Sequence, residues 1–519
     1  MSEITNIIGF SFSKKSKTTL RGITARGEGA LFYPATHAEI NAAMEKASAA
    51  FQTYRNSTGL QRATFLRAIA DEIEAIGPAL IETAMEESGL PEGRIMGERG
   101  RTCGQLRFFA GYVEEGSWVE AVIDRGDPAR QPLPKPDIRR MLVPMGPVVV
   151  FTASNFPLAF STAGGDTVSA LAAGCPVVVK SHEAHPATND LVARAIQRAA
   201  QRTGLPDGVF SSLNGGYPVG QALVKHPRTA AVAFTGSLRG GKALFDLANK
   251  RPVPIPVFSE MGSVNPIFIL PGILEAQADG IAQQIAASVS LGAGQFCTNP
   301  GLVFVPQEQA GGFSRLLADA MSRVQPQCML NHRIFEGYLR SLRQVKEGHR
   351  IDIVYEGELE QAPFVRPSVG VAEVSAFLKN IHLQEEVFGP FTLLVAYTGA
   401  DDLLQIANAM QGQLTATVFC EKNRLPEWHG LMDALRETSG RLILNGVPTG
   451  VEVCHAMQHG GPFPATTDSR FTSVGTAAIR RFARPLAWQN FPDDMLPEAL
   501  KEDNPLKIWR LEEGGFVRV

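Results

Sequence analysis

Apolar and polar positions change their spacing along the chain, and these changes divide it into segments. From His37 to Ser88, apolar residues recur every three or four positions, as in INAAMEKASAAFQTYR, with glycine and proline at the ends. This spacing predicts a helical N-terminal lobe. From Asp124 to Pro144 the chain is dense in proline and charge, which favours an extended arm and makes this segment a candidate oligomer contact.

Short runs of branched aliphatic residues alternate with helical segments in the rest of the chain. GPVVVFTAS, CPVVVK and AAVAFTG are separated by such segments, and a second alternating section runs from about Asn265 to Gly460. This alternation is typical of a parallel sheet covered by helices. Ligands bind at the carboxyl ends of the strands in such sheets, which draws attention to Asn155, Lys180 and Gly236.

The composition is that of a large globular protein. A chain of 519 residues is too long for a single hydrophobic core, so two or more domains are expected. The formal net charge of -3 makes nucleic acid an unlikely partner, and the longest apolar stretch is broken by prolines, so no membrane span is expected. The N-terminus lacks the order of a secretory signal. Six scattered cysteines without metal-ligand spacing favour reduced thiols, a cytoplasmic location and no metal site.

Among the six cysteines, Cys297 has the setting that best suits a nucleophile. The segment SLGAGQFCTNPG surrounds it with Gly292, Gly294 and Gly301. Such small residues let a substrate and backbone N–H groups approach the sulfur closely. A buried structural cysteine is the alternative that the local sequence leaves open.

Several other positions are ambiguous when taken singly. FTGSLRGG, residues 234–241, joins a predicted strand to a predicted helix, but it lacks the GxGxxG spacing and suits a tight turn as well as a phosphate-binding loop. Lys180 could bind phosphate or ribose, or reach solvent from its strand end. Glu260 and Asn155 lie at breaks between apolar runs, where helix caps and turn formers are also common.

Seven motifs, taken together, resemble the aldehyde dehydrogenase superfamily over roughly residues 30 to 490. They occur in the order of that family: ASNFP, VVKSHEAHP, FTGSLRGG, SEMGSVNP, GQFCTNP, EEVFGPF and HGGPFPATTDSRFTSVG. GGDTVSALAAGCPVVVK, GQFCTNPG and NGVPTGVEV are most similar to a bacterial branch with 2,5-dioxovalerate (alpha-ketoglutaric semialdehyde) dehydrogenases and an NADP-linked fatty aldehyde dehydrogenase. The resemblance implies oxidation of an aldehyde to a carboxylic acid with NAD or NADP.

The resemblance carries three catalytic roles over to this chain. Cys297, the cysteine of GQFC, is expected to attack the aldehyde carbon and form a thiohemiacetal. Transfer of hydride to the cofactor is then expected to convert this adduct into a thioester. Asn155 and the backbone N–H of Cys297 are expected to stabilise the oxyanion. Glu260 is expected to activate the water that hydrolyses the thioester.

The resemblance also implies a dinucleotide site without a regular GxGxxG. It assigns Lys180 to the adenosine ribose and Glu386 to the nicotinamide ribose, and it places Phe388 near the nicotinamide. The loop beside the pyrophosphate is expected to contain Gly236, Ser237 and Gly241.

Glu183, in KSHE, bears on the choice of nucleotide. Its carboxylate could accept both hydroxyls of the adenosine ribose but would repel a 2'-phosphate, which favours NAD. Lys180 and His182 could neutralise a phosphate, so NADP stays open.

The sequence leaves two classes of aldehyde open as the substrate. A keto-acid semialdehyde such as 2,5-dioxopentanoate needs a cation for its distal carboxylate; Arg107 and Arg470 are candidates, each with a surface ion pair as the alternative. A fatty aldehyde would instead need an apolar tunnel. Candidate lining residues for such a tunnel are Phe108, Phe156, Phe296 and Phe463.

The resemblance predicts an α/β fold with two Rossmann-like parallel-sheet domains and a small oligomerisation sheet. The cofactor-binding domain is expected at 1–124 and 145–262, the catalytic domain at 263–470, and the oligomerisation arm at 125–144 and 478–495. A homodimer or homotetramer is expected.

Two other functional classes are weighed against the dehydrogenase. One is a non-catalytic binding or structural protein on the same fold. The other is a thiol hydrolase, which would need a histidine such as His459 held near Cys297.

Overall fold

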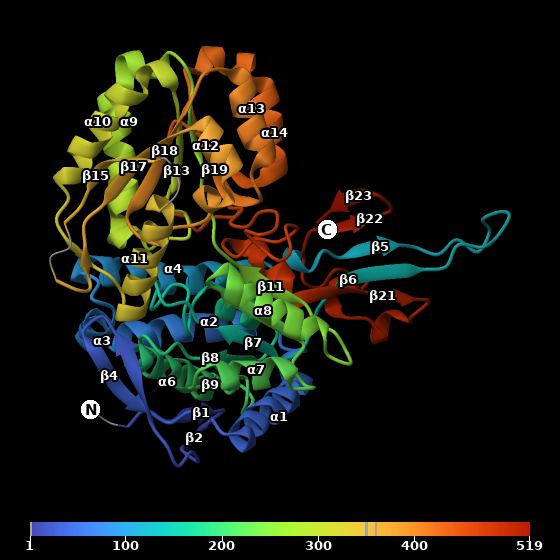
Figure 1. Ribbon diagram of the computed structural model, residues 1–519. Coiled ribbons are helices and arrows are strands. Elements are labelled where there is room, and N and C mark those ends of the chain that lie inside the picture. Colours follow the sequence, from blue (N-terminus) through green and yellow to red (C-terminus); the bar gives the residue numbers. More distant parts are fainter. Residues whose placement is uncertain (1–2, 348–350, 359–360, 519) are drawn as a thin grey trace.

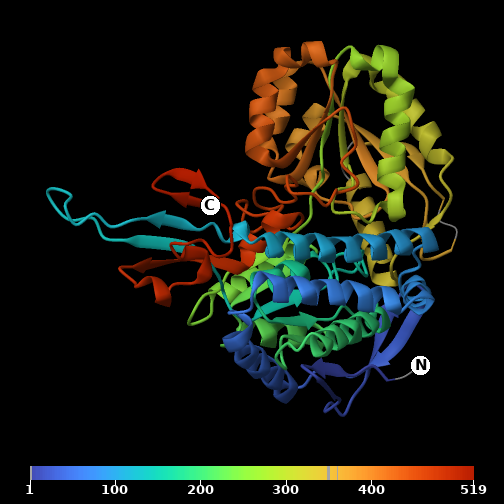
Figure 2. The same cartoon turned by 180° about the vertical axis from the view of Figure 1, so that it is seen from behind.

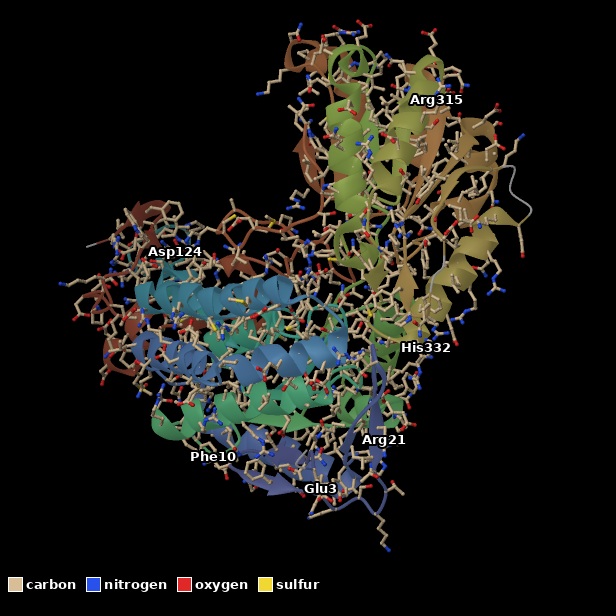
Figure 3. All side chains as sticks on the ribbon, turned by 90° about the vertical axis from the view of Figure 1, so that its left-hand side faces the viewer. Glu3, Phe10, Arg21, Asp124, Arg315 and His332 are labelled. Carbon is tan, nitrogen blue, oxygen red and sulfur yellow. The ribbon has the colours of Figure 1, made fainter. Side chains whose placement is uncertain are left out.

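The computed structural model describes residues 3–347, 351–358 and 361–518, and these form two lobes and a projecting arm (Figure 1). The lower lobe in Figure 1 holds the first half of the chain, and the upper lobe holds the segment from β12 (Ile267–Ile269) to β20 (Ser439–Leu444). In the side view of Figure 3, His332 lies near the junction of the lobes and Arg315 lies towards the far end of the upper lobe. Among the described residues, no helix is long and apolar enough to span a membrane.

The lower lobe is built on a seven-stranded sheet in the order β11-β10-β7-β8-β9-β1-β2. Neighbouring strands from β11 to β9 are parallel, and β1 and β2 add antiparallel pairs at one edge. The sequence pattern did not predict β1 and β2, because a strand of three residues is too short to show a period. The strands are β1 (Asn6–Ile8), β2 (Ser11–Ser13), β7 (Val148–Phe151), β8 (Val177–Lys180), β9 (Phe210–Leu213), β10 (Ala231–Thr235) and β11 (Val257–Glu260).

Helices cover both faces of this sheet because its strands bury side chains on both sides. Val148 and Val150 of β7 pack into the core shared with α2, α4, α5 and α6, whereas Val149 and Phe151 pack against α1, α7 and α8. In Figure 2 the long pale-blue helix α4 runs along the side that faces the upper lobe. The helices are α1 (His37–Tyr54), α2 (Gly59–Ala75), α3 (Pro78–Ser88), α4 (Glu92–Glu115), α5 (Gly165–Ala173), α6 (Pro186–Arg202), α7 (Tyr217–Lys225) and α8 (Leu238–Asn249).

The upper lobe contains a second seven-stranded sheet, in the order β15-β17-β18-β13-β12-β19-β20. All neighbours are parallel except β15 and β17. Helices α9 (Ile273–Ser290) and α10 (Gln307–Ser322) pack on one face; α11 (His332–Lys346), α12 (Val374–Lys379), α13 (Ala400–Ala409) and α14 (His429–Thr438) pack on the other. The remaining strands are β13 (Leu302–Pro306), β15 (Asp352–Glu356), β17 (Ser368–Glu373), β18 (Phe391–Tyr397) and β19 (Gln413–Phe419).

The arm is a separate sheet in the order β21-β6-β5-β22-β23. The antiparallel pairing of β6 (Ile138–Pro144) with β21 (Ala483–Gln489) joins the two segments in which the oligomerisation arm was expected. Three strands were not predicted, and each is only three residues long: β5 (Val122–Asp124), β22 (Arg510–Glu512) and β23 (Gly515–Val517). β22 pairs with β5 in parallel, so the end of the chain extends the arm.

Candidate active site

Three side chains from distant parts of the sequence meet at the carboxyl end of β11. Glu260 is the last residue of β11, Cys297 lies in the loop between α9 and β13, and His459 lies in the loop after β20. His459 Nε2 is 3.4 Å from Cys297 Sγ and 2.9 Å from Glu260 Oε1. The side chains of His459 and Glu260 are 0% and 2% exposed, so this pair is closed to bulk solvent.

The surroundings favour an ionised Glu260 and a protonated Cys297 in the resting site. Burial raises the pKa of Glu260, but His459, Ser473 and Cys297 outweigh it and bring that pKa below its ordinary value. Burial and the Glu260 carboxylate raise the pKa of Cys297 well above that of a free thiol. Because the thiolate is the nucleophile, a base must take the proton of Cys297 before it can attack.

Ser473 fixes the positions of Glu260 and His459. Its Oγ donates to Glu260 Oε2 and its backbone N–H donates to the His459 carbonyl at 2.8 Å. His459 Nδ1 is buried and has no hydrogen-bond partner among the described residues. An unpaired N–H is the costlier buried group, so we place the ring proton on Nε2, where Glu260 accepts it.

The loop that carries Cys297 uses left-handed backbone. Gly292, Ala293 and Gly294 have φ values of 57°, 56° and 68°. A Cβ on Gly294 would lie 2.3 Å from the carbonyl carbon of Gly389. Gly294 is therefore required for close packing against the VFGP segment, a role that the glycine density around Cys297 did not reveal.

Two asparagines hold this loop. The Nδ2 of Asn155, just past β7, donates to the Gln295 carbonyl at 3.0 Å. An amide has two N–H donors, so Asn155 keeps one for an oxyanion. Asn265 Nδ2 donates to the carbonyls of Cys297 and Asn299 at 2.8 and 3.0 Å. Asn265 was not predicted from the sequence as a site residue, although it belongs to the SEMGSVNP motif.

Two cavities of about 520 and 580 Å³ meet at the N-terminal end of α8. Lys180 and Glu183 line the first, Glu386 lines the second, and Ser237 lines both. Ser237 is the N-cap of α8 and accepts a hydrogen bond from the Gly240 N–H at 3.2 Å. The two cavities fit the two halves of a dinucleotide, with the pyrophosphate at the positive end of the helix.

Glu386 supports this fit. Its carboxyl group makes no hydrogen bond to any residue in the described part of the chain, and burial raises its pKa to about 8. A Cβ on Gly262 would lie 2.3 Å from Glu386 Oε2, so a larger residue there would displace the carboxylate from this position. A ribose diol would supply the partners that Glu386 lacks.

The other predicted cofactor residues lie in different settings. Gly236 and Gly241 act through packing, because a Cβ on them would lie 2.6 Å from the Phe234 ring and from Met261 Sδ, respectively. Phe388 is half-buried, and its contact with a nicotinamide stays a prediction.

Burial disfavours the charged forms of two side chains at the adenosine end of the groove. Burial lowers the pKa of Lys180 to about 8 and that of His182 well below its usual value. Arg333 of α11 places Nη1 3.6 Å from Glu183 Oε2. Glu183 therefore has a cationic partner from the other lobe, which the sequence did not indicate.

The two arginines considered for substrate binding have other partners. Arg107 pairs with Asp71 at 3.0 Å and with Glu74 at 2.6 Å on the surface of α2. Arg470 is 79% exposed and pairs with Asp468. Both take the surface ion-pair role that was the alternative, so the structure does not support them as carboxylate ligands.

The four phenylalanines considered for an apolar tunnel do not form one group. Phe156 packs against Phe296 at 5.2 Å between ring centroids and against Phe160 at 5.0 Å, beside the Cys297 loop. Phe108 lies on α4 and contacts the ring of a histidine in the loop after β20. Phe463 is 59% exposed and stands apart from the cluster.

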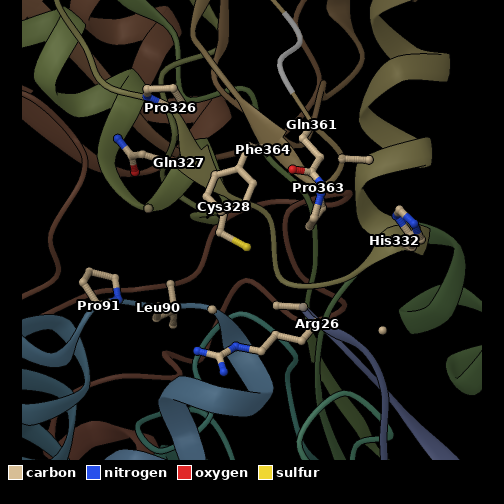
Figure 4. Close-up of a pocket in the computed structure, with 15 residues that line it drawn as sticks. Arg26, Leu90, Pro91, Pro326, Gln327, Cys328, His332, Gln361, Pro363 and Phe364 are labelled. Atoms are coloured by element: carbon tan, nitrogen blue, oxygen red, sulfur yellow. The ribbon is translucent and has the colours of Figure 1, made fainter.

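A further cavity, of about 640 Å³, lies elsewhere between the lobes (Figure 4). It opens among the hairpin of β3 (Leu20–Thr24) and β4 (Gly27–Phe32), the start of α4, and the small sheet of β14 (Gln327–Cys328) and β16 (Phe364–Val365). Arg26, Cys328 and His332 line it, whereas Cys297, Glu260 and His459 do not.

A nucleophilic thiol, a buried acid–base pair and a two-part dinucleotide groove lie together in this α/β fold. They define a class of enzyme: a dinucleotide-dependent oxidoreductase that acts through a covalent adduct on cysteine.

Comparison with known proteins identifies the family. The sequence model of the Aldehyde dehydrogenase family matches residues 25–462, and the chain belongs to that family. It is 48% identical to alpha-ketoglutaric semialdehyde dehydrogenase 2 of Azospirillum brasilense over 98% of both chains. It is 46% identical to an alpha-ketoglutaric semialdehyde dehydrogenase of Acinetobacter baylyi over 94% of both. An NAD+ complex of an aldehyde dehydrogenase from Bacillus cereus matches the fold with a TM-score of 0.81 at 22% identity, over 94% of this chain and 96% of that one.

Proposed function

We propose that this protein oxidises 2,5-dioxopentanoate (alpha-ketoglutaric semialdehyde) to 2-oxoglutarate with NAD or NADP. The cluster of Cys297, His459 and Glu260 beside the dinucleotide groove carries the proposal, because it supplies both steps of an oxidation through a thioester. The substrate is proposed from the two relatives at 46% and 48% identity.

The first step is attack by Cys297 on the aldehyde carbon. The proton of the thiol passes to the Glu260 carboxylate, and the His459 ring between them keeps that carboxylate in place. The sulfur forms a bond to the carbonyl carbon, and the oxyanion lies against Asn155 Nδ2 and the Cys297 N–H. The bound nicotinamide supplies the acceptor for the hydride that leaves this carbon.

The second step is hydrolysis of the thioester. Once the proton gained from Cys297 has passed to solvent, Glu260 takes a proton from a water molecule, which attacks the acyl carbon. The Cys297 thiolate leaves and takes this proton back from Glu260, which releases the carboxylic acid and restores the thiol. Ser473 and His459 both donate to Glu260, so its oxygens stay within reach of the adduct. The same carboxylate is thus the base in both steps.

We favour NAD as the cofactor. Support comes from Glu183, which lines the cavity proposed for the adenosine half and whose carboxylate would repel a 2'-phosphate there, and from His182, whose lowered pKa keeps it neutral. In the described part of the chain, Arg333 alone forms an ion pair with Glu183, and its side chain is 72% exposed.

We further propose a homodimer or a dimer of dimers. β20 and β21 are edge strands of the upper-lobe sheet and the arm sheet, so each presents unpaired backbone groups that a second copy can use. Light scattering coupled to gel filtration measures the mass; a monomer at micromolar concentration would contradict this proposal.

Steady-state kinetics test the main proposal. The purified protein is assayed with 2,5-dioxopentanoate, hexanal and decanal, each with NAD and with NADP. We expect the highest kcat/KM with 2,5-dioxopentanoate. A higher value with decanal would replace the proposed substrate with a fatty aldehyde.

A thiol hydrolase is a second candidate, because His459 lies 3.4 Å from the Cys297 sulfur, as a Cys/His pair would require. A Cys297→Ser variant loses activity in either case. Turnover that needs NAD or NADP belongs only to the dehydrogenase, whereas aldehyde-independent ester hydrolysis at a comparable kcat without cofactor would favour the hydrolase.

A further inference from the structure

Two half-buried arginines near Cys297 have no acidic partner. Arg101 lies on α4 and Arg441 on β20, and neither forms an ion pair with any residue described in the structure. Arg94, about two helical turns before Arg101, is different because it pairs with Glu98 at 3.4 Å. Glu98 and the exposed Glu452 act on Arg101 only from beyond ion-pair distance. Buried charges are usually paired directly, so the lack of an ion pair on either arginine among the described residues calls for an explanation.

Both guanidinium groups are held by the loop of residues 445–458, which begins with NGVPTGVEV. Arg101 Nη1 donates to the Val451 carbonyl, and Arg441 Nη2 donates to the Pro448 carbonyl at 3.0 Å. The Nε of Arg441 is buried and has no hydrogen-bond partner among the described residues. These neutral carbonyls fix the two side chains in position but do not replace an ion pair.

The same loop covers the catalytic cysteine. Thr449 Oγ1 donates to the carbonyl of Thr298, the residue after Cys297, at 3.2 Å. Burial lowers the pKa of Arg101 and of Arg441, whereas the Cys297 sulfur raises the pKa of both. Both arginines thus contact the loop that is hydrogen-bonded to the residue after Cys297, which places them on the side of this loop nearest the catalytic cysteine.

We propose that Arg101 and Arg441 bind the distal carboxylate of the substrate whose aldehyde reacts at Cys297. This inference rests on the proposed function and adds the residues that select the substrate. A guanidinium fork matches a carboxylate in two hydrogen bonds, and two such groups from α4 and β20 would hold it from two sides.

The aromatic cluster beside Cys297 suits the middle of such a substrate. Arg101 lies over the ring of Phe160 at 5.8 Å, and Phe160 packs on Phe156. An acidic aldehyde would place its methylene carbons against these rings and its carboxylate on the arginines. A fatty aldehyde would leave both cations without a partner, so the site discriminates against it.

Arg101→Met and Arg441→Met test the proposal on the full-length enzyme. We expect each change to lower kcat/KM for 2,5-dioxopentanoate by about 10- to 100-fold, mainly through KM, since each removes a hydrogen bond between charged groups. Pentanal has the same chain length and no carboxylate, so its kcat/KM should stay unchanged. Arg441→Lys keeps a point charge and should restore part of the loss. Arg107→Met, on the same helix as Arg101 but in a surface ion pair, is the matched control.

A binding measurement provides a readout without turnover. Glutarate, a non-reacting dicarboxylate, should slow alkylation of Cys297 by iodoacetamide in the unsubstituted enzyme and lose this effect in Arg101→Met and Arg441→Met. Equal losses with 2,5-dioxopentanoate and pentanal would overturn the proposal, because they would mean that the arginines only support the loop. Unchanged kinetics and protection would overturn it as well.

The outcome also separates this inference from the proposed function. If the enzyme prefers succinic semialdehyde to 2,5-dioxopentanoate and the preference depends on the two arginines, the substrate is wrong and the arginine site stands. If 2,5-dioxopentanoate is the preferred substrate and the arginine variants oxidise it normally, the function stands and the arginine site is wrong.

Discussion

Replacement of His459 by phenylalanine isolates the contribution of this residue to the acid–base pair. The ring is fully buried, packs near Phe160, and donates to Glu260 at 2.9 Å, so a phenyl ring keeps most of the volume and removes only the donor. Glu260 would keep Ser473 as a hydrogen-bond donor.

The expected effect is a rise in the pKa of Glu260. Burial acts to raise that pKa, and His459 is the first of the groups that oppose it. Loss of one partner from a buried polar group costs about 1 to 3 kcal/mol, which corresponds to roughly 1 to 2 pH units. Glu260 must be ionised to act as a base, so activity falls as the pH drops through its pKa. The acidic limb of kcat/KM should therefore move to higher pH in the variant.

The assay is the pH dependence of kcat/KM with a saturating cofactor, and the rate of Cys297 alkylation over the same pH range. His459→Gln keeps an N–H donor and should move the acidic limb less. His429→Phe changes an exposed histidine at the start of α14 and serves as the control. A folded His459→Phe protein with an unmoved acidic limb would refute the role of this residue in holding Glu260 ionised.

Three further substitutions test the thioester chemistry, the oxyanion site and a buried ion pair. Glu260→Gln removes the base of both steps, so it should slow both alkylation of Cys297 by iodoacetamide and steady-state turnover by about 100- to 10,000-fold; normal alkylation and normal turnover would contradict the assigned base. Asn155→Ala should lower kcat about 100- to 1,000-fold with unchanged cofactor binding, measured by rapid kinetics and calorimetry, and a loss of cofactor affinity instead would indicate a structural role. Asp166→Ala removes the partner of the buried Arg481, 2.7 Å away, and should lower the free energy of unfolding by about 3 to 5 kcal/mol in urea titration; a change below about 1 kcal/mol would mean that the pair is not needed for stability.

Local sequence signals anticipated much of the fold. Alternation of branched aliphatic runs with helical segments predicted the two parallel-rich sheets, and the spacing from His37 to Ser88 corresponds to helices α1 to α3. Very short strands such as β1, β5 and β23 were not predicted. Three residues are too few to show a hydrophobic period, and strand pairing depends on partners elsewhere in the chain.

The sequence also supplied the candidate chemistry, since the ordered motifs singled out Cys297, Glu260 and Asn155. The tertiary structure added what surrounds them. Ser473 and His459 contact Glu260 from more than 190 residues away along the chain, a separation that no local pattern covers.

The arginines show most directly what only the tertiary structure decided. By sequence, Arg107 and Arg470 were candidates for a substrate carboxylate, and Arg101 and Arg441 were not considered. The fold supplies acidic partners to Arg107 and Arg470, whereas no described residue forms an ion pair with Arg101 or Arg441. Residue type is set by the sequence, but whether a charge is already neutralised depends on contacts between segments as far apart as α4 and the loop after β20.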